Sequence, residues 1–493
     1  MGTRFPVFAR SAMRCVQPAL VLLLLASNSQ AAEFVLMFDK AALDQSFNGR
    51  VHVILLRSEP ATVAGGFNWF NPEPAFAKEV KNWQPGTELI IDGSAISISP
   101  ISEVKPGKYF AQAILDRDLG GISFASSPGN LYSKPVMLEF DPKTTGKVRL
   151  KLDQVARASE FKESDTIRLV SCESKLLSNF HGKPIALRAG VILPPSFAKE
   201  PRRKYPIVYS IPGFGGDHLL ATSTAARKPW DLAGTEAIWV VLDPNCRLGH
   251  HVFADSENNG PCGKALVEEL IPAIENKYRG NGKRLVTGHS SGGWSSLWLQ
   301  ITYPDMFHGC WSTSPDSVDF RDFQRIDLYN PGSNMFVDSS GTRRPIARRG
   351  GKPALFVKPF SDMEVVMGRG GQLASFEAVF SPRGTDGQPL QLWDRKSGAI
   401  RMDVAKDWEK YDVRLVLERN WTKLGPKLKG KLHIYMGEVD TFYLDGATRL
   451  LKESLATLGS DAVVQLFPGK DHGLVDAALR ERINKEMAAA LKE

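Results

Sequence analysis

Between about residue 34 and residue 155, hydrophobic and polar positions alternate with a period of two, which is typical of strands. Pro-Gly pairs separate the alternating stretches and indicate turns. Because no convincing helical periodicity lies between them, the pattern predicts a β-sandwich, an accessory domain over residues 32–158. The clearest predicted strands are 51–56, 88–91, 109–115 and 148–152.

Beyond residue 158 the pattern changes to continuous apolar runs that alternate with helical stretches. Such runs are typical of parallel strands that are buried on both faces. The alternation predicts an α/β domain over 159–493, with a mostly parallel sheet flanked by helices. A stretch too long for an ordinary loop, 316–430, interrupts it as a candidate cap, and 404–420 within it is predicted to be helical. The predicted strands are 167–169, 185–193, 206–211, 237–242, 284–288, 308–314, 431–436 and 463–467, and the helix 263–278 lies among them.

The N-terminal residues carry an export pattern. Three arginines precede an apolar run over 16–26, and residues 29–31 have the small-x-small form that signal peptidase reads. The run is too short to span a bilayer, so we expect a signal peptide over 1–31, no stable membrane anchor, and a periplasmic or secreted protein. Its removal lowers the formal net charge of +8 by three. The charge that remains is mild and forms no long basic block, so nucleic-acid binding is not expected.

The composition, 43% hydrophobic and 24% charged residues, is that of a globular protein and excludes a disordered or collagen-like chain. Export permits disulfides, and Cys172, Cys246, Cys262 and Cys310 remain when Cys15 leaves with the signal peptide. Four cysteines allow three complete pairings, which the spacing leaves open. The sequence has neither a Cys-x-x-Cys pair nor a histidine cluster, so no metal or other cofactor is expected.

Residues 288–292, Gly-His-Ser-Ser-Gly, fit the G-x-S-x-G pattern of a nucleophile elbow. The predicted strand 284–288 runs into this segment, and a predicted helix over 291–303 leaves it. A sharp turn from strand to helix exposes the serine hydroxyl, and glycine neighbours allow the close packing that the turn requires. The context therefore indicates Ser290 as a nucleophile for acyl transfer.

A serine hydroxyl needs a base to take its proton. His472 lies directly after the last predicted strand, where the order Ser, Asp or Glu, then His places that base. His289 lies inside the elbow, and we expect its side chain to turn away. The acid that orients the imidazole should follow the intervening strand 431–435, and we choose Asp440 there. The alternative acids that stay open are Glu438 and Asp445 in the same loop and Asp316 after the preceding strand.

The oxyanion of a tetrahedral intermediate needs two backbone N–H donors. One is Ser291, the residue after the nucleophile. The other should follow the third strand of the sheet, where the glycine-rich turn 212–216 lies. We predict the N–H of Phe214, with that of Gly215 as second choice. The turn lacks the lysine and the serine or threonine of a P-loop, so nucleotide binding is not expected.

Together these motifs resemble the α/β-hydrolase family that includes enterochelin esterases and esterase D, over about 167–493. The resemblance implies the α/β-hydrolase fold and ester hydrolysis without a cofactor, and in that family a β-sandwich can precede the catalytic domain. The chain departs from the family in having Pro212 where relatives commonly carry histidine, and in a longer insertion after Ser314. The motifs that carry the resemblance are 212–216, 253–256, 268–272, the elbow, 303–307 and 469–472.

The resemblance also bears on the cysteines. In the family's strand order Cys172 and Cys310 lie about 24 Å apart, too far for a bridge. It leaves Cys246 and Cys262, which flank one loop, as the pair expected to form a disulfide.

These inferences lead to an exported serine esterase that acts through a Ser-His-Asp triad and an acyl-enzyme on small-molecule or carbohydrate-linked esters. The same triad suits a peptidase or an acyltransferase. A third interpretation, from another class, is a catalytically silent protein whose β domain and tryptophan-bearing insertion bind glycans or a partner. No sequence motif indicates the oligomeric state, the acyl group or the alcohol of the substrate.

Overall fold

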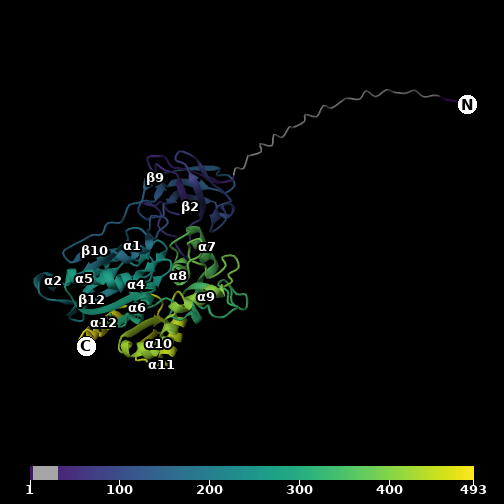
Figure 1. Cartoon of the computed structure of the whole chain (residues 1–493). Helices are drawn as coiled ribbons and strands as arrows, with labels where there is room; N and C mark the ends of the chain where they lie inside the picture. The colour runs from purple at the N-terminus through teal and green to yellow at the C-terminus, as the bar shows by residue number, and fades with distance from the viewer. Residues whose placement is uncertain (4–30, 493) are drawn as a thin grey trace.

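The computed structural model describes residues 1–3 and 31–492 of the 493-residue chain. The predicted signal peptide therefore lies almost entirely outside the described residues. Figure 1 shows an all-β unit in purple and blue that rests on a larger α/β unit. Among the described helices, none is long and apolar enough to cross a membrane.

The N-terminal unit is built from strands and one short 3-10 turn, Ile101–Glu103. Its described strands are hydrogen-bonded into one nine-stranded sheet in the order β4-β1-β9-β7-β6-β2-β3-β5, with β8 paired to β6. The all-β prediction is therefore confirmed, and hydrogen bonds join the strands into one continuous path. The strands are β1 (Glu33–Met37), β2 (Phe47–Leu56), β3 (Ala75–Trp83), β4 (Leu89–Ile91), β5 (Ile96–Ser97), β6 (Gly107–Asp116), β7 (Leu131–Ser133), β8 (Val136–Phe140) and β9 (Lys147–Val155).

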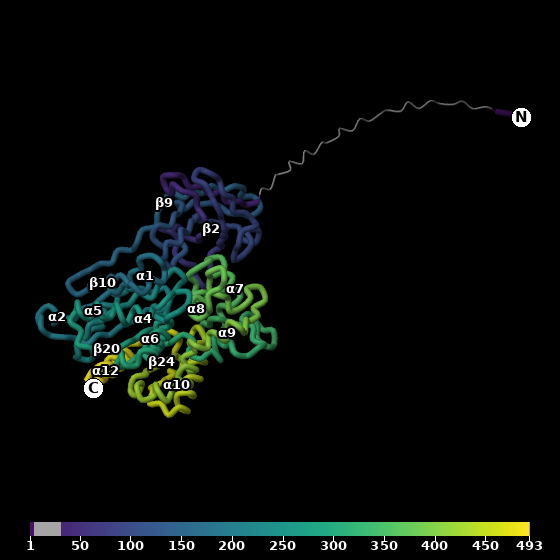
Figure 2. Tube along the Cα trace, in the orientation of Figure 1, coloured from purple at the N-terminus to yellow at the C-terminus, as the bar shows by residue number. Residues whose placement is uncertain are grey.

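Both faces of the central strand β2 are buried, although its pattern is that of a half-buried strand. Val51, Val53 and Leu55 point into the core of the β unit itself. Ile54, on the opposite face, belongs to the large core of the α/β unit. The tube view shows the β unit directly beside the α/β unit (Figure 2). The two units on either side of residue 158 therefore pack directly against each other.

The α/β unit contains all eight strands that the sequence predicts, in the order β10-β11-β15-β12-β20-β21-β24-β25. The strands from β15 to β25 pair in parallel, whereas β11 is antiparallel to both of its neighbours. This is the mostly parallel sheet of the prediction. The strands are β10 (Ile167–Glu173), β11 (Ala186–Ile192), β12 (Tyr205–Ile211), β15 (Ile238–Leu242), β20 (Gly280–His289), β21 (Gly309–Thr313), β24 (Leu432–Gly437) and β25 (Val463–Phe467).

Helices cover both faces of this sheet, because successive residues of a buried strand point to opposite sides. Val208 and Leu285 pack against the C-terminal helix α12 (Ala477–Ala490). Ile207 and Val286 belong to the opposite core, which holds α5 (Ile271–Tyr278), α6 (Ser291–Thr302) and α11 (Asp445–Thr457). The predicted helix 263–278 is present as α4 (Cys262–Ala265), a π-helical turn and α5.

The insertion between β21 and β24 folds into a compact helical lobe beside the β unit (green in Figure 1). The stretch predicted as one helix, 404–420, is broken at Asp412, whose carboxylate accepts a hydrogen bond from Leu415 N and begins a new helix. The elements of the insertion are β22 (Pro345–Arg349), β23 (Lys352–Phe356), α7 (Val357–Met367), α8 (Gln372–Phe380), α9 (Met402–Trp408) and α10 (Val413–Leu428). The remaining short elements are α1 (Lys175–His181), α2 (Ser196–Lys199), α3 (Ala221–Ala225), β13 (Asp231–Leu232), β14 (Thr235–Glu236), β16 (Asn245–Cys246), β17 (Gly249–His250), β18 (Asp255–Ser256) and β19 (Gly260–Pro261).

The expected disulfide between Cys246 and Cys262 is absent, and these two residues are free thiols like the other described cysteines. Both thiols use Asn259 as a hydrogen-bond acceptor. Cys246 Sγ donates to the side-chain oxygen at 3.5 Å, and Cys262 Sγ donates to the main-chain carbonyl at 3.4 Å. Burial raises the pKa of Cys246 to about 11, so this thiol stays protonated near neutral pH.

A buried arginine from the insertion joins it to the β unit. Arg369 donates two hydrogen bonds to the carboxylate of Asp116 at the end of β6, at 2.6 and 2.7 Å. The side chains are 9% and 5% exposed, so little water screens this pair. Two further contacts from β2 reinforce the junction, since Arg50 and His52 donate to the carbonyls of Val365 and Val366 in α7. Burial lowers the pKa of His52 to about 3, which keeps its ring neutral.

We expect Arg369→Ala to lower the free energy of unfolding by about 3–5 kcal/mol, because it leaves the buried carboxylate of Asp116 without a cationic partner. Urea denaturation followed by tryptophan fluorescence measures the change. Arg401→Ala is the matched control, since the Arg401–Asp403 pair is largely exposed and its loss should change stability by less than about 0.5 kcal/mol. Equal midpoints for the two variants would contradict the role of this junction.

Candidate functional site

The turn between β20 and α6 holds Ser290 in a strained backbone conformation, with φ 58° and ψ −124°. A non-glycine residue adopts such angles only where its surroundings impose them, at a cost of about 1–3 kcal/mol. A Cβ on Gly288 would collide with the carbonyl of Gly292, and a Cβ on Gly292 would collide with that of Ile211. The backbones of β12, β20 and α6 can therefore approach only because these positions are glycine. This geometry agrees with the predicted elbow.

The imidazole of His472 is held by one carboxylate. His472 lies in the loop after β25, and its Nδ1 is 2.7 Å from Asp440 Oδ2 in the loop after β24. Asp440 is fully buried, and its other oxygen accepts hydrogen bonds from the backbone N–H groups of Phe442 and Leu444. Val439 N donates to Lys470 O and ties the two loops together. The carboxylate thus has a fixed position, and so does the ring.

The pKa of His472 follows from these surroundings. Burial alone lowers it, because the imidazolium is poorly solvated there. The hydrogen bond and the charge of Asp440 act in the opposite direction, with a further contribution from Asp316, and together they raise the pKa above its ordinary value of 6.5. A bound proton on this ring is therefore stabilised, as a general base requires.

The two other candidate acids of the same loop do not contact His472. Glu438 is partly exposed and faces Arg449 at 3.8 Å. Asp445 begins α11 and pairs with Arg348 at 2.6 Å. Of the three acids in this loop, only Asp440 meets the imidazole.

Asp316 lies on the other side of the serine. Its Oδ2 accepts a hydrogen bond of 2.6 Å from Ser291 Oγ, and its Oδ1 accepts a long one of 3.5 Å from Ser290 Oγ. Burial raises the pKa of Asp316 to about 6 in spite of these hydrogen bonds. The structure therefore places this candidate acid beside the nucleophile and not as the hydrogen-bond partner of His472.

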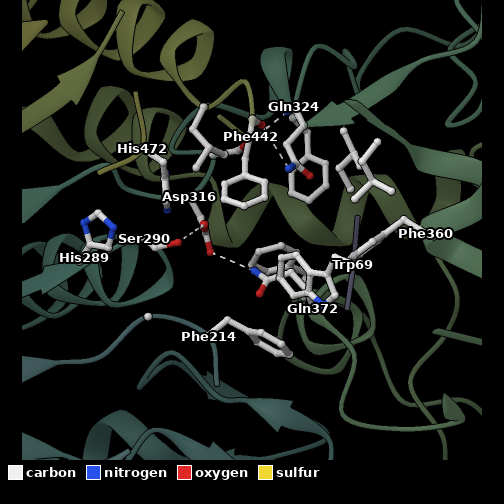
Figure 3. A pocket seen from close by; sticks show the side chains of 17 residues that line it. Trp69, Phe214, His289, Ser290, Asp316, Gln324, Phe360, Gln372, Phe442 and His472 are labelled. Carbon is white, nitrogen blue, oxygen red and sulfur yellow. Dashed lines mark hydrogen bonds between the residues drawn. The ribbon is translucent and has the colours of Figure 1, made fainter. Parts of the chain in front are cut away.

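Ser290 and His472 face the same cavity (Figure 3). In the described part of the chain no hydrogen bond joins them, because Ser290 Oγ is turned toward Asp316. Catalytic hydrogen bonds are often loose in the absence of substrate, and an exposed rotamer changes within nanoseconds. The ring of His289, which we expected to turn away, is 4.8 Å from that of His472 and also lines the cavity. Burial lowers its pKa to about 4, so this ring is neutral.

The predicted oxyanion turn passes directly beside the serine. A Cβ on Gly213 would lie 3.2 Å from Ser290 Cβ, and the next residue, Phe214, lines the cavity. Ser291 is the first residue of α6, so its N–H has no acceptor within the helix. Both predicted N–H donors thus belong to backbone next to Ser290, whereas Gly215 is not among the lining residues.

The Ser290 cavity has a volume of ≈ 270 Å³ and a mostly apolar wall. The β unit contributes Trp69, from the loop between β2 and β3. Its ring centroid is 5.9 Å from that of Phe214, 5.0 Å from that of Phe360 in α7, and 6.0 Å from that of Phe442. Phe442 lies in the loop after β24 that holds Asp440, called the acid loop below. Sequence reasoning missed this residue, because nothing in its loop distinguishes it from a surface tryptophan. The cavity is lined by Trp69, Gly213, Phe214, His289, Ser290, Asp316, Ser317, Phe323, Gln324, Ile346, Leu355, Phe360, Gln372, Phe376, Phe442, Leu444 and His472.

No group of three or more His, Cys, Asp or Glu side chains in the described ranges is arranged to hold a metal ion. The site combines a serine hydroxyl with an imidazole that a carboxylate holds in place, and backbone N–H groups lie beside them. This set of groups suits acyl transfer.

Comparisons with known proteins complete this description. A family model described as "Putative esterase" matches residues 185–417, which include the elbow and the Gly213–Phe214 turn. Asp440 and His472 lie beyond the matched region. The comparison with curated proteins gave no match.

Three solved structures are similar to the chain at low identity. A ferulic acid esterase is 14% identical with a TM-score of 0.41, over 66% of this chain and 98% of its own. An S-formylglutathione hydrolase from Agrobacterium tumefaciens is 15% identical with a TM-score of 0.37, over 66% and 93%. FphF, a fluorophosphonate-binding serine hydrolase of Staphylococcus aureus, is 13% identical with a TM-score of 0.39, over 66% and 98%. The family match shows that residues 185–417 are similar to the putative-esterase family.

Proposed function

We propose that the chain is an exported serine esterase that hydrolyses carboxylic esters of small molecules or carbohydrates through Ser290, His472 and Asp440. The observation that carries the proposal is the 2.7 Å hydrogen bond between His472 and Asp440 at the edge of a cavity that also holds Ser290. Export is supported by the sequence pattern of residues 1–31.

The reaction begins when the Ser290 hydroxyl rotates from Asp316 toward His472. Nε2 of the imidazole takes the proton while Oγ attacks the ester carbonyl, and Asp440 stabilises the imidazolium that forms. The N–H groups of Phe214 and Ser291 donate to the oxyanion, and each such donor contributes about 2.7–4 kcal/mol. His472 then protonates the leaving alcohol. A water molecule repeats the sequence on the acyl-enzyme and restores the serine.

Ser290→Ala should lower kcat for p-nitrophenyl acetate by at least about 10⁴-fold, since it removes the hydroxyl that forms the acyl-enzyme. Stopped-flow or steady-state release of p-nitrophenol measures it. Ser223→Ala is the matched control, because Ser223 is exposed on α3, away from the cavity. Turnover by Ser290→Ala at the rate of the control would exclude the proposed nucleophile.

The pH profile tests the base. His472 acts in its neutral form, so kcat/KM should rise with pH through a pKa above 6.5. Asp440→Asn removes the groups that raise this pKa while burial continues to lower it. The acidic limb of the profile should therefore move to lower pH, and the maximal rate should fall by about 10⁴-fold. Glu438→Gln, in the same loop but turned toward Arg449, should leave both unchanged. An acidic limb that stays in place in Asp440→Asn would contradict the assignment.

We further infer that the β unit, a sandwich-type accessory domain over 32–158, completes the cavity through Trp69. Its indole packs against rings from the oxyanion turn, the insertion and the acid loop, so three separate segments depend on it for their apolar contact. The β unit then acts in substrate selection and not only in presentation.

Trp69→Ala should lower kcat/KM for p-nitrophenyl 3-phenylpropanoate by about tenfold or more relative to p-nitrophenyl acetate, because the larger acyl group loses an apolar wall. Phe70→Ala is the control, since Phe70 stacks on Arg349 and does not line the cavity. The ratio of the two kcat/KM values is the readout. A ratio that Trp69→Ala leaves at the wild-type value would show that the β unit does not shape the site.

A further inference from the structure

Asp316 differs from the other described acids that are at most 5% exposed. Those other acids each have a cationic partner within 4 Å, an arginine or a histidine. Asp316 is 5% exposed, yet no lysine, arginine or histidine of the described residues lies within ion-pair distance of it. Its hydrogen-bond partners are the hydroxyls of Ser290 and Ser291 and the amide of Gln372. The paired acids are Asp116, Asp319, Glu377, Asp412 and Asp440.

A carboxylate in this position is unfavourable for a neutral substrate. A buried charge normally has a counter-charge, and an unpaired one raises its own pKa, as the value of about 6 for Asp316 reflects. Its oxygen is 3.5 Å from the nucleophile, so the oxyanion of the tetrahedral intermediate would form next to a like charge. A cation on the substrate removes both difficulties, because it pairs with the carboxylate and offsets the charge of the oxyanion.

The neighbours of Asp316 suit the same kind of ligand. Oε1 of Gln372 is buried without a hydrogen-bond partner, while its Nε2 is 3.5 Å from Asp316. The rings of Trp69, Phe214 and Phe442 line the same cavity around this polar pair (Figure 3). Aromatic faces attract a cation within about 6 Å and also accept an apolar side chain. Acceptors and aromatic rings in one cavity thus favour a substrate with a positive group and an apolar body.

We infer that the Ser290 cavity selects α-aminoacyl esters, in which the carbon next to the scissile carbonyl carries an ammonium group paired with Asp316 and an apolar side chain against the aromatic wall. This inference rests on the proposed function. In such an ester the nitrogen is two bonds from the carbonyl carbon, so it comes within about 3–4 Å of the attacking Oγ. Asp316 Oδ1 is at the same distance from that oxygen, which allows a direct ion pair.

The chemical step itself is unchanged. Ser290 Oγ bonds to the carbonyl carbon, the bond to the alkoxy oxygen breaks, and the serine proton passes through His472 to the alcohol. Water then releases the amino acid. The ammonium group keeps its protons throughout, so Asp316 is a specificity residue and not a proton carrier.

Three methyl esters of equal skeleton test the inference: L-phenylalanine methyl ester, methyl 3-phenylpropanoate and methyl L-3-phenyllactate, which carry an ammonium, a hydrogen and a hydroxyl on the α carbon. At neutral pH, wild-type kcat/KM should be at least about 100-fold higher for the ammonium ester than for either of the others. In Asp316→Asn this ratio should fall to within about tenfold of one. Glu438→Gln, a carboxylate-to-amide change outside the cavity, should keep the wild-type ratio.

A second measurement needs no variant at the site. 2-Phenylethylammonium should inhibit turnover of p-nitrophenyl acetate by the wild-type enzyme at least tenfold more strongly than 2-phenylethanol, because only the cation pairs with Asp316. Any of three results would overturn the inference. They are equal inhibition by the ammonium compound and the alcohol, equal kcat/KM for the ammonium and hydroxyl esters, and a wild-type kcat/KM ratio in Asp316→Asn. If wild type hydrolyses p-nitrophenyl acetate without preferring the ammonium ester, only this inference fails. If it hydrolyses neither, the proposed function fails as well.

Discussion

The site depends on one constraint, the close approach of three backbones at the turn that carries Ser290. Gly288 and Gly292 leave no room for a side chain between β12, β20 and α6, and this packing imposes the positive φ of the serine. The same turn begins α6, whose first N–H groups have no acceptor within the helix. It also fixes Asp316, whose N–H donates to the carbonyl of Ser290. The proposed nucleophile Ser290, the proposed oxyanion donor Ser291 and the carboxylate of Asp316 therefore share a single scaffold.

Two carboxylates flank this scaffold, and their surroundings give them different properties. Asp440 accepts two backbone N–H groups and the imidazole, so its charge is fully compensated. Asp316 accepts only hydroxyl and amide groups, and its pKa is about 6. Because protein groups balance the charge of Asp440, this carboxylate is suited to orient a base. Because no cationic group of the protein pairs with Asp316, this carboxylate is suited to pair with a positive charge on the substrate.

The strand series and the triad candidates could be predicted from local pattern, because a buried parallel strand and a strand-to-helix serine turn leave short, regular signals. The contributions of Trp69 and Asp316 could not. Each depends on contacts between segments far apart in sequence, since the indole meets rings from three other segments and the carboxylate acquires its role through burial. The expected disulfide failed for the same reason. Sequence spacing brings Cys246 and Cys262 to one loop, but Asn259 accepts hydrogen bonds from both thiols.

The most direct test of the account is a peptide map by mass spectrometry after reaction with an irreversible fluorophosphonate probe. The account predicts that the added mass lies on Ser290 in the wild-type protein. It also predicts that the labelling rate falls by at least about 10³-fold in His472→Ala, because the hydroxyl then has no base. Label on another residue, or an equal rate in His472→Ala, would contradict the claim that these two side chains work together.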